Sequence, residues 1–209
     1  SLEARAHADG VVIWRGAPMT TLAPRAHLTP TPRPWAIALT LLVALVPGAW
    51  FVRFLADIPG LIVAAAAVPA LLFAWGIVRI DRDDPEPRLA LLAALLGGAV
   101  LAAYASHAIN ERLLAWAGSL TSAEQARPLA GGFGAPVVEE IVKGAVLVLL
   151  VLLVRNLVDG ALDGIVYGAL IGVGFAFTEN VLYLAFAMLM GGSAGLAQAV
   201  YVRALLGGF

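Results

Sequence analysis

The sequence predicts an all-α protein, a polytopic bundle of transmembrane helices. Of its 209 residues, 61% are hydrophobic and 13% are charged, whereas soluble domains carry about 25% charged residues. The mean hydropathy is +0.92. Several apolar runs approach the length of about 20 residues that a helix needs to cross a bilayer. Lipid is therefore the expected solvent for most of the chain.

The apolar runs are separated by polar or glycine-rich turns, which gives about six spans in this chain. A charged stretch with two prolines between residues 79 and 88 excludes a helix through lipid at that point, and a polar, somewhat amphipathic segment covers residues 110–128. Because the last run is still apolar at Phe209, we expect the membrane domain, residues 35–209, to be truncated and the full-length protein to have further spans. The predicted spans are 35–55, 59–78, 89–109, 133–154, 163–190 and a run that starts after residue 193.

Residues 1–34 are polar and end in a proline-rich stretch, which predicts a flexible tail. We interpret Met19 as a natural start, with residues 1–18 either not native or encoded from an upstream start, and exclude residues 1–18 from the fold prediction. Lys and Arg favour the cytoplasmic side of a membrane, and an N-terminus inside would place six loop or tail arginines there against three outside. The six are Arg25, Arg33, Arg79, Arg82, Arg88 and Arg155, and the three are Arg53, Arg112 and Arg127.

Charge and cysteine content exclude several classes of function. The formal net charge is −1 and the chain has no basic tract, so nothing predicts a nucleic-acid partner. Cysteine is absent, which excludes disulfides, thiolate metal sites and a cysteine nucleophile.

Ionisable residues inside the predicted spans mark the candidate site, because each costs at least about 2.5 kcal/mol to insert. The fourth span carries Glu139, Glu140 and Lys143, and the fifth carries Glu179. At a rise of about 1.5 Å per residue, Glu139 and Glu179 lie about 9 Å and about 6 Å from the same membrane surface, on antiparallel helices. Asn180 follows Glu179, and Arg203 lies at about 15 Å in the sixth run. We therefore predict that these side chains share one polar chamber.

Helical spacing leaves two pairings open for the adjacent glutamates. Glu139 is four residues from Lys143 and Glu140 is three, so either can meet the ammonium while the other faces a neighbouring helix. Close carboxylates repel one another, and a shared proton or a bound cation relieves that repulsion. Such a pair can move protons for hydrolysis or bind a metal that acidifies water. Phe175 shares a helical face with Glu179.

His107 and the glycines give weaker signals. His107 near the outer end of the third span is either a ligand or base above the carboxylates or a solvated histidine at a helix end. The stretch 131–136 predicts a flexible loop, a hinge or a re-entrant segment before a helix start. Gly164, Gly168 and Gly172, with Gly174 nearby, place small residues where a neighbouring helix can approach closely.

Two motifs on successive spans carry a resemblance to a known family. Glu139-Glu140-Ile141-Val142-Lys143 resembles the EExxK motif of the PrsW intramembrane proteases, and the run from Phe175 to Asn180 resembles their FxxxEN motif. The glycine-rich residues 163–175 and the acidic stretch 81–87 are similar to further parts of the family, so the resemblance covers about residues 79–203. The family is related to the type II CAAX prenyl proteases and has a histidine in a later helix, which this chain does not contain before Phe209.

The resemblance implies an endopeptidase that hydrolyses membrane-anchored proteins, similar to anti-sigma factors, in a bacterial cytoplasmic membrane. Glu139 or Glu140 would activate water, and Glu179 and Asn180 would complete the catalytic pocket. Lys143, Phe175, Arg203 and His107 would support it. A divalent metal such as zinc is a candidate cofactor, with Glu140 and Glu179 as its ligands. The implied partners are the lipid bilayer and a protein substrate, not nucleic acid.

Two other functions fit the same residues. Buried carboxylates beside a basic group, and a glycine–proline break before a span, are typical of proton- or cation-coupled transporters. The sequence shows no inverted repeat, which argues against this class. A membrane adaptor without catalytic activity would instead bind partner helices through the glycine face of the fifth span.

Overall fold

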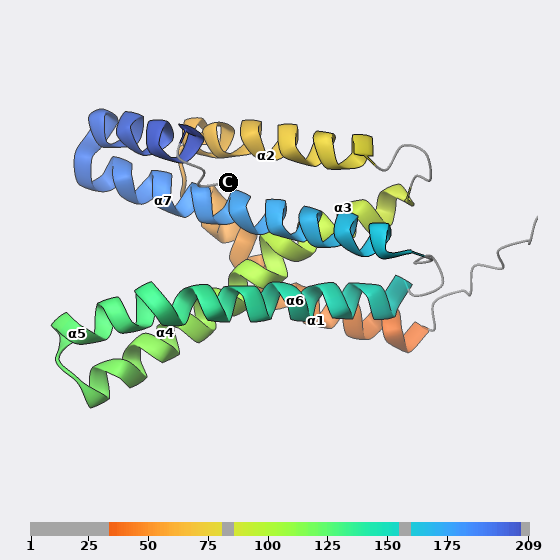
Figure 1. Ribbon diagram of the computed structural model, residues 1–209, viewed down its shortest axis with the longest axis horizontal. Coiled ribbons are helices and arrows are strands. Elements are labelled where there is room, and N and C mark those ends of the chain that lie inside the picture. Colours follow the sequence, from red (N-terminus) through yellow and green to blue (C-terminus); the bar gives the residue numbers. More distant parts are fainter. Residues whose placement is uncertain (1–33, 81–85, 155–159, 206–209) are drawn as a thin grey trace, which may run out of the picture. The chain divides into compact units, whose positions relative to one another are not determined.

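The structure is a computed structural model that describes residues 34–80, 86–154 and 160–205. The predicted tail, apart from residue 34, lies outside these ranges, as do most of the acidic stretch and the last four residues. Every element within the described ranges is a helix (Figure 1). Two of these, η1 and η2, are π-helices that join their neighbours without a break. The elements are α1 (Pro34–Ala56), α2 (Gly60–Ile80), α3 (Arg88–Leu96), η1 (Gly97–Ala102), α4 (Ala103–Leu120), α5 (Ala123–Arg127), η2 (Pro128–Gly134), α6 (Ala135–Val154) and α7 (Ala161–Leu205).

Three helical segments in the described part of the chain are long and apolar enough to cross a membrane: Gly60–Ile80, Arg88–Leu120 and Ala161–Arg203. The all-α prediction is confirmed, whereas the count of about six spans is not. The described apolar part of α1 is short, covering Ala44–Ala56. In α6, two glutamates and a lysine lie within five residues and lower its apolar character.

The third predicted span is longer than expected, because α3, η1 and α4 form one helix of 33 residues. At about 1.5 Å per residue this helix is about 50 Å long, well beyond the hydrocarbon thickness of about 30 Å. The polar segment 110–128 is therefore not a separate element: it supplies the last part of α4 and, after a short turn, α5. The predicted loop at 131–136 is also wrong, since Pro128 starts the π-helix η2, which runs directly into α6.

The chain reverses direction inside α7, at a kink where Gly192 adopts φ 57° and ψ −147°. This positive φ is accessible to glycine at little cost because glycine lacks a Cβ. Figure 1 shows α7 turning back beside α2 after the kink. The predicted fifth and sixth runs are thus the two arms of a helical hairpin.

The first arm of α7 is the centre of the packing, in contact with α2, α3, η1 and α6. Two glycines allow its closest approach to the long helix. A Cβ at Gly98 would collide with the Ile171 carbonyl, and a Cβ at Gly174 would collide with the Leu95 carbonyl. Of the glycines that the sequence singled out on this helix, Gly174 makes the close approach and Gly168 lies against the Leu147 side chain, whereas Cβ positions at Gly164 and Gly172 meet open space. Close approach therefore depends on one glycine from each helix.

A buried hydrogen bond fixes the same contact immediately before Glu179. Thr178 is fully buried, and its hydroxyl donates to the carbonyl of Ala99 in η1 at 2.7 Å. Within a bilayer a backbone carbonyl has no water to bind, so an internal donor is the available partner. This bond sets the rotation of α7 about its axis and hence the direction in which Glu179 points.

Candidate functional site

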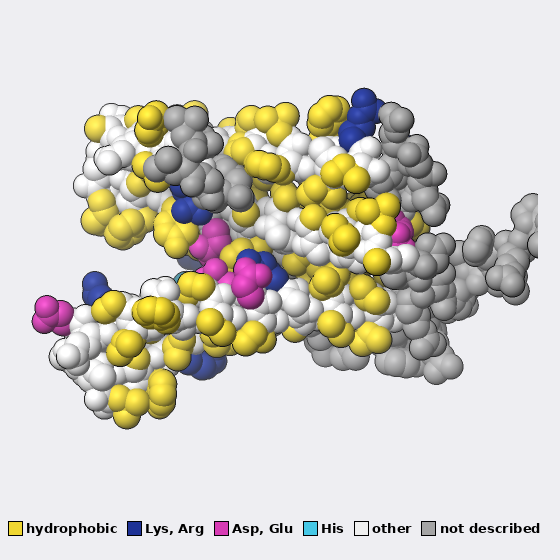
Figure 2. Space-filling view, viewed as in Figure 1, with side chains coloured by type: hydrophobic (Ala, Val, Ile, Leu, Met, Phe, Trp, Pro, Cys, Tyr) yellow, Lys and Arg dark blue, Asp and Glu magenta, His cyan; other side chains and the backbone are white. Residues whose placement is uncertain are grey.

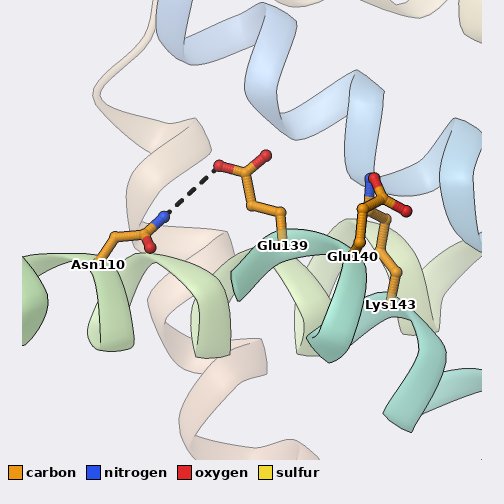
Figure 3. A network of polar contacts seen from close by, with 4 residues as sticks. All are labelled: Asn110, Glu139, Glu140 and Lys143. Carbon is orange, nitrogen blue, oxygen red and sulfur yellow. Dashed lines mark hydrogen bonds and ion pairs between the residues drawn. The ribbon is translucent and has the colours of Figure 1, made fainter. Parts of the chain in front are cut away.

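The two adjacent glutamates of α6 point in different directions, as expected for successive residues about 100° apart on a helix. Glu139 is half-buried and points from α6 toward α7 (Figure 3). The side-chain amide of Asn110 in α4 donates to its Oε1 at 3.5 Å. Glu140 is 76% exposed, and its Oε1 lies 2.5 Å from Nζ of Lys143. Of the two pairings that the sequence left open, the structure has Glu140 with the lysine.

Lys143 connects α6 to the first arm of α7. Its ammonium lies 4.6 Å from the centroid of the Phe175 ring, which is buried on α7. A cation over an aromatic face is attracted by the ring quadrupole. Phe175 therefore holds Lys143 one helical turn from Glu179.

Glu179 and Glu139 come together from antiparallel helices, as the depth argument predicted. Glu179 is half-buried on α7 and lies close enough to Glu139, Arg203 and Lys143 to interact electrostatically with all three. Figure 2 shows acidic and basic side chains gathered between α6 and α7, at the inner end of a hollow. The arrangement places two carboxylates and two cations at one helix interface, where protons can be exchanged with water.

Asn180 and Arg203 connect the two arms of α7 beside this interface. Asn180 is fully buried, and its Oδ1 accepts a hydrogen bond from Nε of Arg203. The Arg203 guanidinium also lies 4.3 Å from the centroid of the Tyr183 ring. These contacts connect Asn180 on the first arm of α7 with Arg203 on the second arm.

Replacing Arg203 by alanine is expected to lower the free energy of unfolding by about 1–3 kcal/mol, because buried Asn180 loses a charged hydrogen-bond donor. Arg203→Lys should lose less, since it keeps the positive charge without the planar guanidinium. Thermal unfolding of the purified protein in detergent measures both. An unchanged melting temperature in Arg203→Ala would contradict the contact.

His107 does not join the glutamates. Its Nε2 lies 3.3 Å from Oε1 of Glu111, one turn further along α4, and its ring centroid lies 6.0 Å from that of Trp50. The side chain is 46% exposed. His107 is thus partly exposed, as in the second of the two sequence interpretations, but it lies within the helix that runs from Arg88 to Leu120 and not at its end.

Sequence reasoning missed two residues that contact the site. Asn110 was visible as an amide at the expected outer end of a span, but its partner depended on how α4 and α6 align. Tyr183 is four residues after Glu179 and shares its helical face. It lies close enough to Glu179 to interact electrostatically.

The described residues do not complete a metal site. No group of three His, Cys, Asp or Glu side chains in this part of the chain is placed to hold an ion. Catalytic zinc sites use three protein ligands, whereas the interface supplies two converging carboxylates, Glu139 and Glu179. Glu140, the predicted ligand, points away toward Lys143 and solvent.

Apolar helices long enough to cross a membrane, with two half-buried carboxylates at a helix interface, are typical of an integral membrane protein with a polar site. Residues 86–209, more than half of the chain, match the family model described as PrsW family intramembrane metalloprotease. The chain belongs to this family and is a membrane peptidase, as the two motifs predicted. Neither a curated protein nor a solved structure gives a significant match.

Proposed function

We propose that the protein is an intramembrane endopeptidase that uses Glu139 to activate water for hydrolysis of a membrane-anchored protein. The observation that carries this proposal is that Glu139 points from α6 toward α7, which packs against it and carries Glu179 within electrostatic reach (Figure 3). We place the protein in a bacterial cytoplasmic membrane because its family resemblance implies one, and we place the N-terminus inside on the basis of the arginine distribution. A single-span regulatory protein of the anti-sigma-factor type is the proposed substrate.

Glu139 suits the role of base better than Glu140. It is half-buried, it faces α7, and Asn110 donates to one oxygen, which leaves the second oxygen available for water. Glu140 is bound by Lys143 and is 76% exposed on the surface of the helix bundle. Catalytic bases must reach the proton that they remove, so direction and burial favour Glu139.

The proposed reaction is a general acid–base hydrolysis. Glu139 removes a proton from water as the water oxygen bonds to the scissile carbonyl carbon. The carbon–nitrogen bond then breaks, and the proton passes from Glu139 to the departing nitrogen, giving a carboxylic acid and an amine and restoring the Glu139 carboxylate. The nearby cations Lys143 and Arg203 offset negative charge that develops on the carbonyl oxygen, and Glu179 supplies a second carboxylate beside the reacting groups.

The test uses purified protein in liposomes with a single-span reporter protein as substrate. We expect Glu179→Gln to reduce the cleavage rate at least about tenfold, because it removes one of two coupled carboxylates. Glu124→Gln is the matched control, since Glu124 is exposed on α5 and lies outside the interface. If the protein instead dissipates a pH gradient across the liposome membrane, if this proton flux requires Glu179, and if no reporter is cleaved, the protein is a transporter and not a protease.

A further inference from the structure

A groove opens between α4 and the α5–η2–α6 segment, next to the proposed catalytic glutamate. Its volume is about 240 Å³, and its walls include His107, Asn110, Glu111, Arg127, Gly131 and Ala135. Ala135 lies one helical turn before Glu139, and Asn110 donates to Glu139. The inner end of the groove therefore reaches the site. A cavity needs only about 10–15 Å³ to hold one water, so the groove has room for water or for a length of substrate chain.

One polar atom at the inner end lacks a partner within the described chain. Oδ1 of Asn110 is buried and accepts no hydrogen bond from the described residues, although its Nδ2 is bound to Glu139. Buried polar atoms in folded proteins almost always have a partner. An unsatisfied acceptor on the wall of a groove indicates a donor from outside this part of the chain, and a backbone N–H of a bound peptide is such a donor.

The far end of the groove carries a cation without an ion-pair partner in the described ranges. Arg127 is exposed, whereas the acidic residue on the same groove, Glu111, is paired with His107. Arg127 precedes Glu139 by twelve residues in a nearly continuous helix, which corresponds to about 18 Å at about 1.5 Å per residue. An extended peptide covers that distance in about five residues at about 3.4 Å each.

We propose that this groove binds an extended segment of the protein substrate and selects an acidic residue about five positions from the scissile bond. Arg127 pairs with that Asp or Glu, and Asn110 accepts a hydrogen bond from the peptide backbone at the inner end. The open wall at Gly131, where a Cβ would meet no atom within 4 Å, leaves room for the substrate main chain. This inference rests on the proposed function and adds its substrate specificity.

The first experiment reverses the charge at position 127 and then the charge of its proposed partner in the substrate. The probe is a single-span reporter whose juxtamembrane segment carries one Asp, moved position by position, with the cleavage site located by mass spectrometry. We expect kcat/KM to peak when the Asp is about five residues from that site, and Arg127→Glu to remove the peak through a higher KM. A reporter with Lys at that position should recover cleavage by Arg127→Glu. Arg112→Glu is the control, because Arg112 is exposed on α4 and donates to its own helix at Ala108.

The second experiment fills the groove. Gly131→Phe should reduce reporter cleavage at least about tenfold while keeping the melting temperature of Gly118→Phe, since the Cβ positions of both glycines are open. Gly118→Phe is the matched control, as its Cβ position on α4 is equally open but lies off the groove. Cleavage by Gly131→Phe equal to that by Gly118→Phe would overturn the proposal.

Binding separates this proposal from the catalytic one. The inactive Glu139→Gln protein should still bind the fluorescently labelled Asp reporter, and adding Arg127→Glu should weaken that binding. If reporter binding depends on Arg127 but the wild-type protein cleaves no reporter, the proposed protease activity is refuted and the proposed peptide-binding groove is retained. If cleavage depends on Glu139 but neither binding nor KM responds to Arg127, the groove proposal fails alone.

Discussion

Glu139→Gln is expected to reduce the rate of reporter cleavage by about 10²–10⁴-fold, the usual contribution of a positioned general base. Glutamine keeps the size of the side chain and can still contact Asn110, so the fold should be retained. The measurement is single-turnover cleavage in liposomes, with the melting temperature of each variant as a check on folding.

Glu140→Gln is the internal comparison, because it lies on the same helix turn and differs mainly in direction. We expect a much smaller loss than for Glu139→Gln, since Glu140 is 76% exposed and bound to Lys143. A larger loss for Glu140→Gln would show that the two glutamates have the opposite roles and would refute the assignment of the base.

Gly174→Ala is expected to cause the largest loss of stability. The added Cβ would collide with the backbone carbonyl of Leu95, and backbone atoms in a packed helix cannot move aside as the end of a flexible side chain can. Overpacking of this kind costs about 1–3 kcal/mol, and we expect the upper end. Unfolding in mixed micelles measures the change.

Gly172→Ala provides the matched control in the same helix, because its Cβ position is open. It should be neutral or slightly stabilising, since alanine favours helix more than glycine does. Equal destabilisation by the two substitutions would mean that helix propensity, and not the contact with α3, explains the effect.

The helical fold and the carboxylate cluster could be predicted because they depend on local patterns. Apolar runs and charges within them are readable residue by residue, and depth follows from a constant rise per residue. That is how Glu139 and Glu179, 40 positions apart, could be placed at one level. The two motifs then identified the family.

The missed features depend on contacts between distant segments. The sequence could not show that helix continues from Arg88 to Leu120, because the polar residues after 109 read as a surface segment. The choice of Glu140 as the partner of Lys143 depends on where α7 places Phe175. The close approach at Gly174 depends on where the Leu95 carbonyl of another helix lies, so no periodicity within α7 could identify it.

The hydrogen bonds around the site differ greatly in sequence separation. Arg203 and Asn180 are 23 residues apart, and Asn110 and Glu139 are 29 apart, so each pair lies within a local helical hairpin. Thr178 and Ala99 are 79 apart and join the two hairpins. Because loop closure costs more entropy at greater separation, each hairpin can form early during synthesis. Each then carries one of the two glutamates of the acidic pocket, Glu139 or Glu179. The pocket exists only after the hairpins dock, so assembly of the interface, and not insertion of either helix pair, is the step that creates an active enzyme.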